Sequence, residues 1–96
     1  MAAQKDAGDD IAMRRKRLRF RAWHRGTKEM DLVLGPYADA HLDGLDANGL
    51  DRLETLMDEE DTDLLAWVIG QETPPEAVDG ELLERLVEFR RSRTSS

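Results

Sequence analysis

The residues best suited to molecular recognition lie in one short stretch, FRAWHRGTKEMDLVLG, at positions 20–35. Arg25 carries a planar guanidinium that can bind a carboxylate through two parallel hydrogen bonds. Gly26 has no side chain, so the backbone of another molecule can approach closely there. Glu29 supplies the opposite charge nearby. Such a set of residues is suited to recognising a protein surface and does not make a reaction centre.

The same residues also have a purely structural interpretation. Gly26 would end one helix by taking the left-handed conformation, and a second helix would start after it. Arg25 and Glu29 would then pair across the turn as a surface ion pair, worth at most about 1 kcal/mol. From the residues alone, both interpretations stay open.

Other kinds of chemistry find little support in the composition. The 96 residues include no cysteine and only two histidines, His24 and His41, which excludes disulfides and leaves too few ligands for a structural zinc site. The acidic run at 58–61 lacks the alternating oxygen ligands of an EF-hand, so we interpret it as a solvated corner. None of the 21 acidic residues stands out as part of a catalytic pair. We expect no enzymatic activity, no metal site and no cofactor of its own.

A basic run, RRKRLRFR at 14–21, precedes an acidic body. Residues 11–28 contain eight Arg or Lys and no acid, whereas residues 29–88 contain eighteen Asp or Glu and two Arg. The run is suited to docking on an acidic protein surface. Alternatively, it would bind nucleic acid through phosphate contacts, with Phe20 and Trp23 stacking on bases. The acidic body repels nucleic acid, so this is the second choice.

The elements that position these residues are predicted to be helices, because leucine is abundant and no stretch alternates with the period of a strand. Five side chains are suited to capping helix N-termini: Asp10, Thr27, Asp46, Asp61 and Asp79. The five predicted segments run from about Asp10 to Trp23, from Lys28 to about Leu42, and onward from Asp46, Asp61 and Asp79. Gly70 is expected to end the fourth.

The second segment contains an interruption, Gly35-Pro36. Helix propensity alone favours a split there. A continuous, kinked helix fits equally well, because an interior proline removes one hydrogen bond without forbidding continuation.

Together the segments predict an all-α fold, a compact bundle of about five short helices. We expect one domain at 10–91, a flexible N-terminus at 1–9 and a flexible tail at 92–96. No run of about 18 apolar residues is present that would span a membrane, and the acidic start favours a bacterial cytoplasm. The predicted core includes Val33, Leu53, Leu64, Trp67, Leu83 and Leu86.

The stretch at 20–35, with its Arg-Gly-x-x-Glu core, resembles the small FAD assembly factors of succinate dehydrogenase. This family is called assembly factor 2 in mitochondria, and its bacterial members promote flavinylation. The resemblance continues through Pro36, the run DTDLLAW at 61–67 and the leucine-rich terminal segment, so it covers roughly residues 13–91. The departures are a longer N-terminus and a glycine before Pro36. Some members have been catalogued as antitoxins, but nothing here resembles a toxin-neutralising segment.

The resemblance implies a five-helix bundle without enzymatic activity that acts in respiration and the tricarboxylic acid cycle. Its partner would be the flavoprotein subunit of succinate dehydrogenase, and in some cases that of fumarate reductase. It would promote the covalent attachment of FAD, which belongs to the partner, to a histidine of that subunit. We also expect a monomer that binds no nucleic acid and does not insert into membranes. The implied partner-binding residues are Arg25, Gly26 and Glu29, their neighbours His24, Lys28 and Asp31, and Arg17 and Arg21 on the basic helix.

Overall fold

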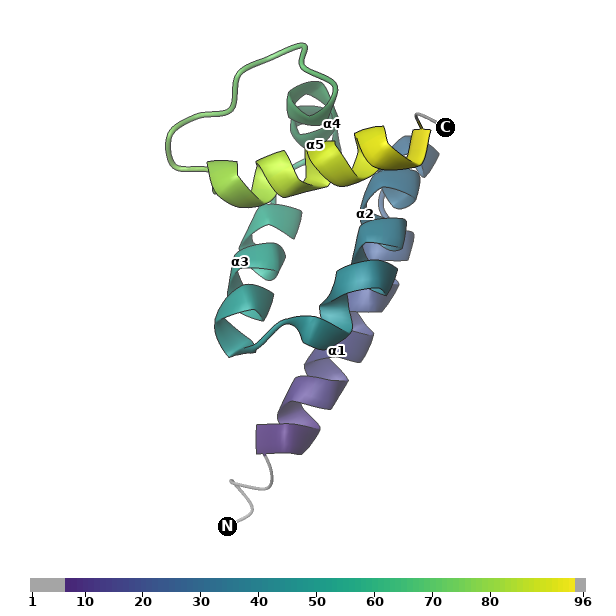
Figure 1. The fold of residues 1–96 in the computed structure, drawn as a ribbon, viewed down its shortest axis with the longest axis vertical. Helices are drawn as coiled ribbons and strands as arrows, with labels where there is room; N and C mark the ends of the chain where they lie inside the picture. The colour runs from purple at the N-terminus through teal and green to yellow at the C-terminus, as the bar shows by residue number, and fades with distance from the viewer. Residues whose placement is uncertain (1–6, 95–96) are drawn as a thin grey trace.

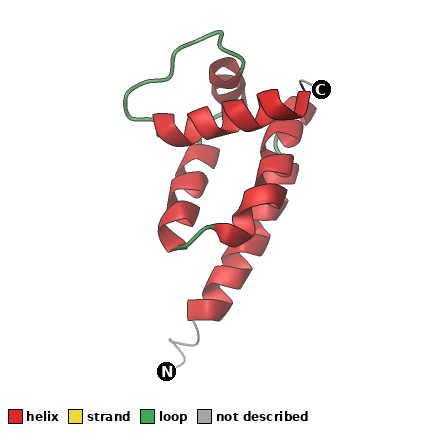
Figure 2. Cartoon of the chain, in the orientation of Figure 1, coloured by secondary structure: helices red, strands yellow, loops and turns green. Residues whose placement is uncertain are grey.

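The computed structural model describes residues 7–94, and all regular structure within that range is helical (Figures 1 and 2). This confirms the predicted all-α fold. The helices are α1 (Ala7–Trp23), α2 (Lys28–His41), the short 3-10 helix η2 (Leu42–Gly44), α3 (Ala47–Met57), α4 (Asp61–Val68) and α5 (Gly80–Thr94).

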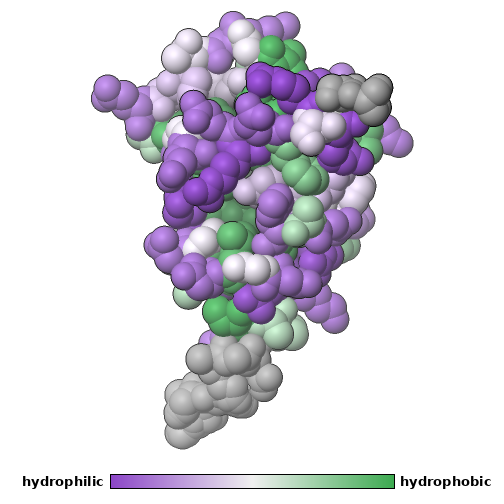
Figure 3. All heavy atoms as spheres, viewed as in Figure 1, coloured by the Kyte–Doolittle hydropathy of each residue, from purple (hydrophilic) through white to green (hydrophobic). Residues whose placement is uncertain are grey.

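The helices enclose one core. Helices α1 and α2 make the most extensive contact, and α5 packs against α2, α3 and α4. In Figure 1, α5 lies across the ends of α2 and α3, with α4 behind it. Figure 3 shows a mostly hydrophilic face with small, separate apolar patches. The six core residues predicted from the sequence are all buried, and Trp67, for example, is 8% exposed.

Three of the predicted N-caps are confirmed. The Thr27 hydroxyl accepts a hydrogen bond from the Met30 N–H, and the Asp46 carboxylate accepts one from the Gly49 N–H. The Asp79 carboxylate accepts one from the Leu82 N–H. Each bond satisfies a backbone donor that the first turn of a helix leaves without a partner.

The boundaries of the first and last helices differ from the prediction. Helix α1 begins at Ala7, so Asp10 lies inside its first turn, where a carboxylate stabilises the positive end of a helix without capping it. Helix α5 continues to Thr94, into the segment predicted to be a tail. Residues 1–6 and 95–96 lie outside the described range.

The end of α1 has a different cause from the one predicted. Among the described glycines, positive φ occurs at Gly70 (84°), which confirms it as the end of α4, and not at Gly26. The helix ends because two successive backbone N–H groups bind carboxylates instead of helical carbonyls. The Arg25 N–H donates to Asp31 at 2.6 Å, and the Gly26 N–H donates to Asp61 at 2.6 Å.

Helix α2 is continuous through Pro36, so the split favoured by propensity is wrong and the continuous alternative is correct. The residue before Pro36 packs closely against α1. A Cβ built on Gly35 would lie 2.4 Å from the ring of Trp23, which means that the indole lies directly against the α2 backbone. This close packing favours an unbroken α2 although Pro36 lacks a backbone donor.

The chain contains no helix that combines the length and apolarity needed to cross a bilayer, as judged over the described residues.

Candidate docking site

The turn between α1 and α2, residues 24–27, is held from α4; it is called the Arg-Gly turn below. One oxygen of the Asp61 carboxylate accepts from Arg25 Nε at 2.8 Å, and the other accepts from the Gly26 N–H. Arg25 Nη2 also donates to the carbonyl oxygen of Glu59 at 3.2 Å. A single carboxylate at the start of α4 therefore fixes both residues of the Arg-Gly pair.

A second carboxylate holds the turn from α2. Asp31, in the first turn of α2, accepts from the backbone N–H of Arg25. The Arg25 and Asp61 side chains are only 10% and 15% exposed, so water weakens their attraction less than at an open surface. Removing either partner would leave a largely buried charge without compensation. The turn is thus rigidly placed between α2 and α4.

This geometry corrects two expectations about Arg25. It pairs with Asp61 rather than with Glu29, and its guanidinium is already occupied instead of being available to a partner's carboxylate. Asp61 was expected to cap α4, but Glu60 occupies the N-cap position and Asp61 is the first helical residue. Asp61 shortly precedes the apolar run of α4, a position typical of an N-cap. No local feature of the sequence indicated its contact with Gly26.

Other residues predicted for the site point outward. Glu29 and Lys28, in the first turn of α2, are exposed, as are His24 and Arg17. The His24 ring stacks on Phe20 with centroids 4.0 Å apart and 17° between the planes, and its Nδ1 donates to the Phe20 carbonyl oxygen at 2.8 Å. Lys28 and Glu29, which directly follow the Arg-Gly turn, carry opposite charges.

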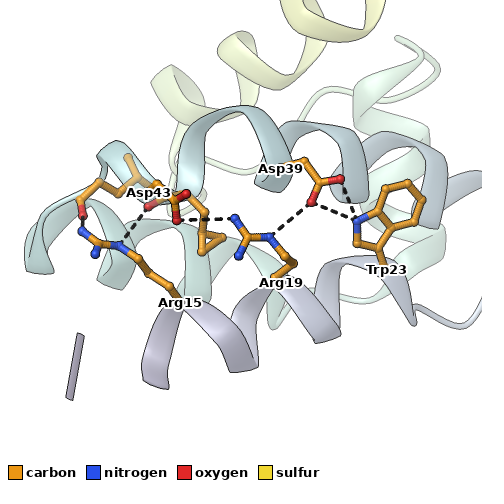
Figure 4. A network of polar contacts seen from close by, with 7 residues as sticks. Arg15, Arg19, Trp23, Asp39 and Asp43 are labelled. Carbon is orange, nitrogen blue, oxygen red and sulfur yellow. Dashed lines mark hydrogen bonds and ion pairs between the residues drawn. The ribbon is translucent and has the colours of Figure 1, made fainter. Parts of the chain in front are cut away.

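Most of the basic run faces the protein's own acidic body. Arg19 binds Asp39 and Asp43 on α2 and η2, and Arg15 donates to two backbone carbonyls (Figure 4). The indole N–H of Trp23 also donates to Asp39 (Figure 4). The further pairs are Arg14 with Asp51 and Glu54, and Arg21 with Asp58 and Glu54.

This pairing changes the interpretation of the basic run. Arg21, predicted to bind a partner, has its nearest carboxylate at 2.9 Å on Asp58. Lys16 and Arg17 are the basic residues of the run whose side chains make no hydrogen bond or ion pair with any residue that the structure describes. Few cations are left to bind phosphates, so the nucleic-acid alternative loses its basis.

Comparison with known proteins identifies the family. A family model described as "Flavinator of succinate dehydrogenase" matches residues 16–90, which include the Arg-Gly turn and Asp61. The chain belongs to this family. The match confirms the resemblance seen in the sequence.

Individual relatives agree with the family match. The "FAD assembly factor SdhE" of Acetobacter pasteurianus is 39% identical over 87 residues, which cover 91% of this chain and 80% of the relative. "Succinate dehydrogenase assembly factor 2, mitochondrial" of Arabidopsis thaliana is 42% identical over 62 residues, 65% of this chain and 33% of the relative. The zebrafish (Danio rerio) protein of the same name is 29% identical over 94% of this chain and 58% of its own length. The search of solved structures gave no match.

Proposed function

We propose that this chain is an assembly factor that binds the flavoprotein subunit of succinate dehydrogenase and promotes the covalent attachment of FAD to it. The observation that carries this proposal is the family match over residues 16–90. The name of the bacterial relative, an FAD assembly factor, points to the same role for a protein of similar length.

The geometry of the Arg-Gly turn supports a docking role. Gly26 is exposed and without a side chain, and exposed groups of both charges, such as Glu29 and Lys28, lie beside it. The turn is held by Asp31 and Asp61, so little conformational freedom remains to be lost on binding. A small, rigid, charged surface of this kind fits transient binding to another protein.

The proposed mechanism is a shift of the partner's conformational population. A helper that binds one conformer of the flavoprotein more tightly than another favours it by the difference in binding free energy. If the favoured conformer is the one competent for flavin attachment, no catalytic group is required from the helper. In this proposal the chain is not an enzyme, and FAD and its acceptor histidine belong to the partner.

The proposal also includes finer points. Following the resemblance, the flavoprotein of fumarate reductase is a second partner, and the chain acts as a monomer. The bacterial cytoplasm is the proposed location. The support is the bacterial relative, 80% of whose length aligns with this chain.

The test is complementation of bacterial cells that lack their own helper, read out as in-gel fluorescence of covalently bound flavin in the flavoprotein subunit. The native chain should restore the fluorescence, and Gly26→Arg should not, because a long cation would occupy the centre of the docking surface. Glu29→Ala should reduce it more mildly. Gly44→Arg is the matched control, since Gly44 is exposed and a Cβ there meets nothing within 4 Å.

Two outcomes would overturn the proposal. One is a native chain that is produced and folded but restores no covalent flavin. The other is a folded Gly26→Arg protein that restores as much flavin as Gly44→Arg, which would remove the Arg-Gly turn from the docking surface.

A further inference from the structure

Asp61 stands apart from Asp63, the other acidic residue in the first turn of α4. Its carboxylate, 15% exposed, binds the Arg25 side chain and the Gly26 N–H at once. Asp63 lies in the same turn and is exposed, and its side chain makes no hydrogen bond or ion pair with any other described residue. Both carboxylates lie near the positive end of the helix, so the helix dipole does not distinguish them. The contact with the Arg-Gly turn does.

The need for glycine at position 26 also has its origin inside the molecule. Gly26 does not have a positive φ, so backbone strain does not explain it. A Cβ built there would lie 3.2 Å from Asp61 Oδ2, closer than nine in ten real Cβ contacts. A side chain at position 26 therefore pushes against Asp61 before any partner arrives.

We propose that Asp61 is a positioning residue for docking: by binding Arg25 and Gly26 together, it holds the Arg-Gly turn in the shape that the flavoprotein recognises. The inference rests on the proposed function and deepens it. In this arrangement Arg25 contributes by binding Asp61 within the protein. Gly26 has no side chain, which leaves space for Asp61 to bind its backbone N–H.

The physical reason is that the turn has little other support. Between α1 and α2 the backbone N–H groups of Arg25 and Gly26 bind side-chain carboxylates, not helical carbonyls. Without Asp61, the Gly26 N–H loses its partner and the Arg25 guanidinium keeps only the Glu59 carbonyl oxygen, so the turn samples further conformations. The observed dissociation constant then rises, because it equals the intrinsic constant divided by the fraction of molecules in the docking-competent shape.

The first experiment measures the dissociation constant for the purified flavoprotein subunit by isothermal titration calorimetry. Asp61→Ala should weaken binding by about tenfold or more, which corresponds to losing one strong polar contact. Asp61→Asn should have a smaller effect, since its amide oxygen can still accept from the Gly26 N–H. Asp63→Ala, the matched control, should bind like the native chain.

A second experiment separates positioning from a general loss of stability. Gly26→Ala is measured in the native background and in the Asp61→Ala background, in a double-mutant cycle. In the native background the added methyl group displaces Asp61 and weakens binding. Once Asp61 is replaced, the methyl group has room, so Gly26→Ala should cause little further loss. Circular dichroism establishes that each variant is folded at the temperature used.

The outcomes distinguish this inference from the proposed function. If the native chain does not bind the flavoprotein, the proposed function fails. If it binds and Asp61→Ala binds equally well, the inference is overturned. Equal losses from Gly26→Ala in both backgrounds also overturn it, because Gly26 would then serve the partner's approach alone. Should Asp61→Ala not fold, Asp61→Asn compared with Asp63→Asn decides in the same way.

Discussion

The Asp79 carboxylate binds three donors on two helices. Arg52 of α3 donates to both of its oxygens, at 2.6 and 2.9 Å, and the Leu82 N–H of α5 donates to it at 3.1 Å. The hydrogen bonds from Arg52 lower the pKa of Asp79 below its ordinary value; burial opposes the shift, and the Leu82 N–H adds to it. Asp79 thus couples the start of α5 to α3 through its negative charge.

This coupling predicts a dependence of stability on pH. Because the pKa of Asp79 is lower in the folded chain, its contribution is fully present above the unfolded value of about 4 and is lost as pH falls through the folded value. Asp79→Asn should therefore lower the free energy of unfolding by about 1 kcal/mol or more at pH 7. The difference from the native chain should shrink as the pH is lowered below about 4, towards the folded pKa of Asp79.

Urea denaturation at pH 7 and at an acidic pH below about 4 checks this prediction. The exposed Asp63→Asn is the control. A destabilisation by Asp79→Asn that is the same at both pH values would assign the effect to lost packing rather than lost charge.

Residue-level features were predictable from the sequence where the interaction is local. The caps at Thr27, Asp46 and Asp79 each bind an N–H three residues ahead, and residue type is sufficient to indicate them. The role of Asp61 was not predictable in this way, because its partners, Arg25 and Gly26, lie far away in the sequence. Only the folded chain brings them together.

At the scale of the helices, α4 offers a clean comparison between a buried and an exposed side chain. Trp67 is 8% exposed and belongs to the core, whereas Ile69, directly after the helix, is 41% exposed. Trp67→Ala should lower the free energy of unfolding by roughly 3–5 kcal/mol through lost burial and the cavity left behind. So small a domain would then be close to unfolded.

Chemical denaturation followed by circular dichroism measures this effect. Ile69→Ala, which removes a large apolar side chain at the same helix end, should cost far less. A change within about 0.5 kcal/mol for Trp67→Ala would contradict the assigned core, since that range is typical of surface positions.

Helix periodicity was a sound guide to the elements because it reflects which face each helix buries, and Leu50, Leu53 and Leu56 on α3 illustrate this. Helix periodicity did not predict that α2 is continuous. Helix α2 continues through Pro36 while Gly35 packs against Trp23 of α1, a contact that belongs to the packing of two helices. Local propensity carries no information about such a contact.

For the whole molecule, the charge pattern predicts weak interaction with nucleic acids. The net charge is −7, and most arginines of the basic run are paired with the protein's own carboxylates or carbonyls. We expect no binding of fluorescent DNA or RNA oligonucleotides at physiological salt, measured by anisotropy over a salt titration. Micromolar binding that weakens steeply with added salt would indicate that counterions are released from phosphates and would contradict this prediction.

The segregation of charge was plain in the sequence, but its purpose was not. Eight basic residues at 11–28 and eighteen acidic ones at 29–88 suggested a surface for an external partner. In the fold, α1 lies along α2 and α3, so many of the basic residues pair with the protein's own carboxylates, and the acidic residues remain in excess. Composition indicates which charges are present, and only the arrangement of helices decides which of them stay exposed.

The contact between Trp23 and Gly35 links the sizes of two side chains on different helices. Since a Cβ at position 35 would lie 2.4 Å from the indole, Gly35→Ala alone should force α1 away from α2 and lower the melting temperature. Combined with Trp23→Leu, the same alanine should be better tolerated, because the smaller side chain leaves room for it. Across the family, the side-chain volumes at positions 23 and 35 should therefore vary inversely. A bulky residue at one position should accompany a small residue at the other.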